Sequence, residues 1–138
     1  MKRIALTLML LISISAAAKS KKRPISREPG LRVITPVRDP FFVTLAEAES
    51  LSAKTKVHVI DVREEREFNE LKVNSKLKVL FVPLSELSRG DGYKELLKSI
   101  PKGDLIVFIC ANGARAKLAR DYVVAKGYDA RFASLYKF

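Results

Sequence analysis

The sequence predicts an α/β domain with a central, mostly parallel sheet of about five strands and helices on both faces. Short apolar runs rich in β-branched residues alternate with segments of helical pattern, which is typical of strands joined by crossover helices. The expected strands lie at residues 57–62, 79–82, 105–109 and 130–134. The run 105–109 is apolar throughout, as expected for a strand that is buried on both faces of a parallel sheet.

The segments between these runs carry helix signals. Thr44 and Glu47 form a capping-box pattern, so a helix is expected from there to about residue 51. Residues 64–70 begin with acidic side chains, which suit a helix N-terminus, and we interpret Glu64, Glu65, Glu67 and Glu70 as a solvated helical face. Further helices are expected at 93–99 and at 114–126, the second ending at Gly127. Because ligands bind at the carboxyl ends of strands in such sheets, that edge is the expected working edge.

The first 18 residues predict a secretory signal peptide. Lys2 and Arg3 precede an apolar run at 4–14, which is too short to span a bilayer comfortably, and small residues at 16–18 follow it. We expect cleavage after Ala18 and a periplasmic or secreted protein. An uncleaved hydrophobic anchor is the alternative.

Residues 19–38 predict a basic, flexible tail, and residues 39–138 a single domain. The tail has seven basic side chains and one acidic one, interrupted by Pro24, Pro29, Gly30 and Pro36. The domain has 17 basic and 14 acidic side chains, so much of the net charge of +11 belongs to the tail. A solvated leader is the favoured interpretation, and weak contact with an anionic membrane surface is the alternative. No aromatic residues alternate with these charges, so nucleic acid is not an expected partner.

Cys110, the single cysteine, is the main candidate for chemistry. It follows the strand at 105–109 and precedes the longest expected helix, and an exported thiol without a partner in its own chain is a candidate reactive group. A helix N-terminus and a nearby cation both favour the thiolate. Gly113 permits the tight turn, so the loop amides can form a concave anion site, and Arg115 can hold an oxyanion.

The loop Cys110-Ala111-Asn112-Gly113-Ala114-Arg115 resembles the active-site loop of the rhodanese sulfurtransferases. Residues 59–64, 67–68, 82–87 and 118–128 resemble further motifs of that family in the same order, so the resemblance covers about 43–134. With an export signal, the chain is similar to the single-domain periplasmic members. The resemblance implies a rhodanese-like fold and no metal or organic cofactor.

The resemblance also implies roles for the loop residues. Cys110 would take the outer sulfur of a small anionic donor such as thiosulfate as a persulfide and pass it to cyanide or a small thiol. The backbone amides of Ala111, Asn112, Gly113, Ala114 and Ala116 would stabilise the anionic sulfur, and Arg115 would bind the donor. Asn112 is expected either to face the donor or to satisfy the turn.

Two departures from the family pattern keep an alternative open. Ala116 stands where the family usually has serine, and 135–138 lack the usual paired glycines, so one pocket wall is expected to be open or supplied by another molecule. A catalytically degenerate binding or sulfur-carrier module is therefore the second hypothesis. A cysteine phosphatase or arsenate reductase is disfavoured, because four residues separate Cys110 from Arg115 where those enzymes place five.

Three other polar residues in or next to the expected strand at 57–62 have mainly structural interpretations. Asp61 is expected to cap the following turn or to pair with Arg63, and both are supporting candidates at the sheet edge. His58 is expected to be a packed or surface residue, because strand alternation places it on the face opposite Asp61.

Overall fold

The computed structural model describes residues 38–136. The predicted signal peptide at 1–18 and all but the last residue of the predicted tail at 19–38 lie outside these residues. Arg38, assigned to the tail from the sequence, is held in the structure: its guanidinium donates to Glu47 at 2.6 Å and lies over the Phe42 ring. None of the helices in the described part of the chain is long and apolar enough to cross a membrane.

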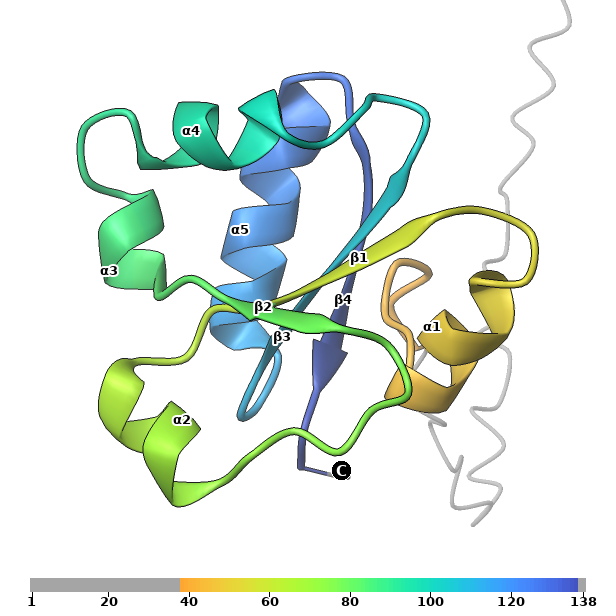
Figure 1. Ribbon diagram of the computed structural model, residues 1–138, viewed down its shortest axis with the longest axis horizontal. Coiled ribbons are helices and arrows are strands. Elements are labelled where there is room, and N and C mark those ends of the chain that lie inside the picture. The colour runs from red at the N-terminus through yellow and green to blue at the C-terminus, as the bar shows by residue number, and fades with distance from the viewer. Residues whose placement is uncertain (1–37, 137–138) are drawn as a thin grey trace, which may run out of the picture. The chain divides into compact units, whose positions relative to one another are not determined.

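Four parallel strands form the sheet, in the order β2-β1-β3-β4 (Figure 1). They are β1 (Val57–Asp61), β2 (Val79–Phe81), β3 (Leu105–Cys110) and β4 (Asp129–Ser134). The predicted α/β class and parallel sheet are confirmed, but the expected number of about five strands is wrong. The chain before the first helix adds only an isolated bridge, between Phe42 and Phe132, because the helix at Leu45 ends the extended segment.

Four of the helices in residues 38–136 occupy the positions that the sequence patterns indicate, within a residue or two, and a further short helix at Leu84–Leu87 was not predicted. They are α1 (Leu45–Leu51), α2 (Glu65–Glu70), α3 (Leu84–Leu87), α4 (Gly92–Lys98) and α5 (Ala114–Ala125). The capping box of Thr44 and Glu47 is present at the start of α1. At the other end of the chain, Gly127 has φ of +84°, and the amides of Gly127 and Tyr128 donate to Val124 and Val123. This is a Schellman motif, and it terminates α5 as expected.

Strand alternation divides the core between the two faces of the sheet. Ile60, Ile106 and Phe108 point toward α3, α4 and α5, and form the larger cluster with residues of those helices. Val59, Val107 and Ile109 point the other way and pack with Val43 and Ala48 beside α1. Every residue of β3 is buried, as the apolar run predicted. The central strand therefore provides a rigid support for whatever follows its carboxyl end.

Candidate active site

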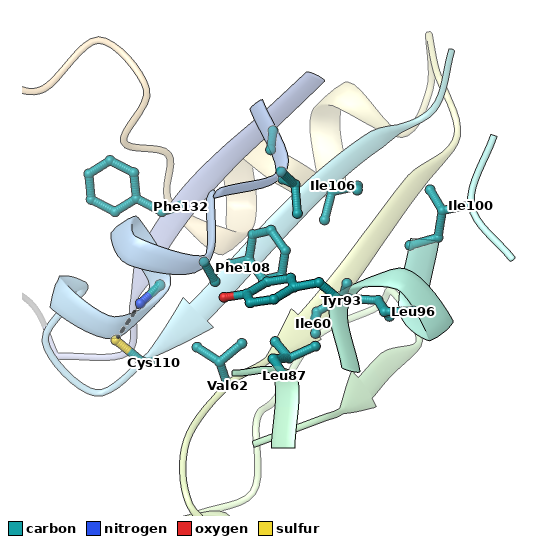
Figure 2. Packing of buried hydrophobic residues seen from close by; sticks show 14 residues of the cluster. Ile60, Val62, Leu87, Tyr93, Leu96, Ile100, Ile106, Phe108, Cys110 and Phe132 are labelled. Atoms are coloured by element: carbon teal, nitrogen blue, oxygen red, sulfur yellow. Dashed lines mark hydrogen bonds between the residues drawn. The ribbon is translucent and has the colours of Figure 1, made fainter. Parts of the chain in front are cut away.

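Cys110 is the last residue of β3 and lies on the α5 side of the sheet. Figure 2 shows it at the margin of the packed side chains, beyond Phe108 and Val62. None of its surface is exposed. The predicted position, at a strand end directly before a helix, is confirmed. The thiol lies beneath its loop rather than on the protein surface.

Two backbone amides of the loop point at the sulfur. Gly113 N lies 3.1 Å and Ala116 N 3.4 Å from Cys110 Sγ (the dashed line in Figure 2 marks such a contact). Gly113 has φ of +87°, a left-handed conformation that other residues adopt at a cost. Together with the positive end of α5, these donors make a site that favours a negative charge on sulfur.

Asn112 and Ala114 are joined by a hydrogen bond within the loop, and the Ala114 amide does not point at the sulfur. Asn112 Oδ1 accepts a hydrogen bond from the Ala114 amide at 3.1 Å and lies 4.0 Å from Cys110 Sγ. This hydrogen bond satisfies the turn, and the expectation that Asn112 faces the donor stays a prediction. Because Ala114 is the first residue of α5, the same bond satisfies one of the free amides at the start of that helix.

Arg115 makes a bidentate ion pair with Glu67, at 2.5 and 2.6 Å. Hydrogen bonding to Arg115 lowers the pKa of Glu67 to about 2. The same contact raises the pKa of Arg115, and the nearby Cys110 adds to this effect. The interpretation of Glu67 as part of a solvated face is wrong, because the fold brings the start of α2 beside the start of α5. Glu64 is also engaged, accepting from the Ser85 hydroxyl at 2.8 Å.

Asp61 and Arg63 form a buried pair beneath the site. Arg63 Nη2 lies 2.7 Å from Asp61 Oδ2, and Arg63 also donates to the carbonyls of Glu67 and Leu71. The pair therefore ties α2 and the residues after it to the end of β1. Neither Asp61 nor Arg63 forms a hydrogen bond with Cys110 Sγ in the described residues, so the geometry supports a structural role for both.

The segment after β4 supports the loop from its other side, which the sequence did not indicate. Ser134 Oγ donates to the Ala111 carbonyl at 2.8 Å, and the amides of Leu135 and Tyr136 donate to Cys110 and Ala111. These bonds fix the loop where it leaves β3. A serine at the end of the final expected strand was the available signal, but its partner could be found only in three dimensions.

His58 lies at the opposite end of the sheet, half-buried, with Nε2 2.7 Å from Asp104 Oδ2. It is thus a packed histidine away from Cys110, as its strand position predicted. Phe42 packs edge-on against Phe132, with ring centroids 5.5 Å apart. Phe41 lies beside two guanidinium groups, those of Arg120 and Arg131.

The chain belongs to the rhodanese-like domain family, whose model matches residues 44–137. That match covers the sheet, the helices α1 to α5 of the described residues and the Cys110 loop. No protein of curated function matches the chain significantly.

Solved structures share the fold at low identity. The single-domain sulfurtransferase RDL2 of Saccharomyces cerevisiae is 24% identical over 72% of this chain and 88% of its own, with a TM-score of 0.51. A Rhodopseudomonas palustris protein of unknown function, described as a possible tyrosine phosphatase, is 22% identical over 67% of this chain and 73% of its own, with a TM-score of 0.51. The CoADR-RHD protein of Bacillus anthracis is 24% identical over 67% of this chain, with a TM-score of 0.51, but the chain spans only 15% of that protein's length.

Proposed function

We propose that the protein transfers a sulfane sulfur from a small anionic donor such as thiosulfate to a thiophilic acceptor, through a persulfide on Cys110. The observation that carries this proposal is the pair of amides, of Gly113 and Ala116, directed at Cys110 Sγ. Preorganised N–H donors stabilise an anionic sulfur before and after the transfer. Membership of the rhodanese-like family supports sulfurtransferase-type activity in general.

The reaction has two balanced steps. The Cys110 thiolate attacks the outer sulfur of thiosulfate, an S–S bond forms, and the donor's own S–S bond breaks with its electron pair leaving on sulfite. Cyanide or a thiolate then attacks the outer persulfide sulfur, forming thiocyanate or a new persulfide and regenerating the Cys110 thiolate. Sulfur moves between nucleophiles in both steps, so no external oxidant or reductant is needed.

The donor reaches the sulfur through a movement at the rim of the site. Cys110 is fully covered, and both terminal nitrogens of Arg115 are engaged by Glu67. An incoming dianion competes with the Glu67 carboxylate for the same guanidinium, which supports exchange of one partner for the other. In this proposal Arg115 binds the donor only after part of its pairing with Glu67 is released.

The test is sulfur loading followed by cyanolysis. The purified protein is treated with thiosulfate, its mass is measured, and cyanide is added. We expect a gain of one sulfur atom on Cys110, followed by release of thiocyanate, and neither in Cys110→Ser with an unchanged circular dichroism spectrum.

A folded protein that gains no sulfur and releases no thiocyanate would instead support the binding-module hypothesis. Hydrolysis of phenyl phosphate without sulfur transfer would move the protein to the phosphatase class. The four-residue spacing between Cys110 and Arg115 argues against that outcome.

A further inference from the structure

A pocket lies at the end of the sheet opposite Cys110. It has a volume of about 530 Å³ and lies between α4 and the carboxyl end of α5, close to the residues that lead into β3 and β4. Figure 1 shows α4 beside the end of α5 that is far from the Cys110 loop. The two sites are separated by roughly the length of β3, about 16 Å. The pocket is within the size range of small-molecule sites.

Lysine side chains dominate the lining of this pocket. Lys94, Lys98, Lys102 and Lys126 line it together with a single carboxylate, that of Asp91. Lys98 pairs with Glu95 at 2.6 Å. Within residues 38–136, no ion pair or backbone hydrogen bond engages the ammonium groups of the other three lysines. Backbone amides donate to the last free carbonyls of α5, so the Lys126 ammonium is not needed to cap the helix.

Aromatic rings position two of these cations. Lys126 Nζ lies 5.5 Å from the centroid of the Tyr122 ring, and Lys102 Nζ lies 5.6 Å from that of Tyr128. The Tyr122 ring stacks on Tyr93 with centroids 4.0 Å apart, and Tyr122 is still 44% exposed. Contact with an aromatic face restrains an otherwise flexible ammonium group. The pocket thus combines partly ordered cations with an accessible aromatic surface.

We propose that this pocket binds a small ligand that carries two or more linked phosphate groups. Several converging lysines suit phosphate oxygens, because each ammonium acts as a point charge that can meet an oxygen from many directions. No arginine lines the pocket, so its lysines would hold the phosphate oxygens as separate point charges and not through a guanidinium fork. If the ligand is a nucleotide, its base can contact the exposed Tyr122 ring. If it is an inorganic polyphosphate, the lysines alone account for binding.

Isothermal titration of the full chain with inorganic tripolyphosphate, ATP and adenosine tests the proposal. We expect tripolyphosphate and ATP to bind at one site and adenosine not to bind. Lys102→Gln combined with Lys126→Gln should weaken binding about tenfold, since each lost phosphate contact removes a modest electrostatic contribution. The matched control is Lys54→Gln with Lys56→Gln, which removes equal charge outside the pocket and should leave affinity within about twofold.

The two phosphate sources are distinguished by Tyr122→Ala. Weaker binding of ATP with unchanged binding of tripolyphosphate identifies a nucleotide, and equal binding in both proteins identifies the polyphosphate chain itself.

Several results would overturn the proposal. These are no binding of either phosphate compound, equal loss in the control double variant, or tighter binding of a glutamate-rich peptide than of tripolyphosphate. Amide NMR shifts confined to residues 111–116 would also overturn it, because they would assign the anion to the Cys110 loop. These readouts do not depend on sulfur transfer, so they are separable from a failure of the proposed activity.

Discussion

Arg63 illustrates what a buried charge requires of its neighbours. Its side chain is 2% exposed and Asp61 is fully buried, yet each guanidinium nitrogen has an acceptor in the Asp61 carboxylate or in the carbonyls of Glu67 and Leu71. With all its hydrogen bonds made, the pair holds α2 in place against β1 but adds little to the free energy of unfolding compared with an apolar pair of similar size. Removing one partner leaves the other charge uncompensated.

We therefore predict that Asp61→Asn lowers the free energy of unfolding by about 3–5 kcal/mol. The control is Asp129→Asn, which breaks the exposed pair with Arg131 and should cost less than about 1 kcal/mol. Urea denaturation of the three proteins measures both values. Equal losses in the two variants would contradict the structural role of Asp61.

The ion pair of Glu67 and Arg115 gives a pH prediction. The pKa of Glu67 falls to about 2 in the folded protein and is about 4.3 in an unfolded chain. A depressed carboxyl pKa contributes stability that is fully present above the unfolded value and is lost as pH falls toward the folded value. Both side chains are partly exposed, so the contribution should stay below about 1 kcal/mol.

The difference in melting temperature between the native protein and Glu67→Gln should therefore be constant from pH 7 to about pH 5 and should shrink below it. Thermal unfolding across this range measures the difference. A difference in melting temperature that increased at acidic pH would show that the folded protein does not stabilise the Glu67 carboxylate.

The two pairs also show which contacts a sequence can predict. Asp61 and Arg63 are two residues apart at a strand end, so local geometry indicated their pairing. Glu67 and Arg115 are 48 residues apart, and no periodicity links them. Only the βαβ packing of the whole domain brings the beginnings of α2 and α5 together.

At the scale of elements, α5 and its preceding turn link the fold to the candidate chemistry. Its length and its glycine signals were predictable, because Gly113 and Gly127 flank a helical pattern. The contact of the Gly113 N–H with the sulfur was not predictable, since the sequence does not specify the backbone angles of residues 110–112. The number of strands was not predictable either: the patterns indicated no position for a fifth strand, and the segment before α1 adds only the bridge between Phe42 and Phe132.

The two glycines form a matched pair for mutation. Gly113→Ala and Gly127→Ala both place a side chain at positive φ, with ordinary contacts to their surroundings, so each should cost about 1–2 kcal/mol. Only Gly113→Ala should also disturb the amide directed at Cys110, and we expect a much larger loss of thiocyanate formation in that variant. Steady-state kinetics below the melting temperature of both variants measures it. Equal activities would argue against a role for the loop amide.

At the scale of the molecule, parallel topology explains why the candidate site could be located in advance. All four strands run the same way, so Asp61 and Cys110 lie at one edge and His58 and Asp104 at the other. The sequence patterns identified that edge because apolar runs and helix signals alternated clearly. They did not reveal the lysine pocket, whose residues come from two separate segments, 90–102 and 122–128.

The bridge between Phe42 and Phe132 also bears on solubility. The Val43 amide donates to the Phe132 carbonyl at 2.9 Å, and the Phe132 amide donates to Phe41 at 3.1 Å. Without these bonds the outer side of β4 would present unpaired backbone groups to other molecules.

Val43→Pro, which removes one donor, should therefore promote concentration-dependent self-association in sedimentation velocity, whereas Val43→Ala should remain monodisperse. The short segment before α1 thus covers part of the open edge of β4 and should limit association through that edge.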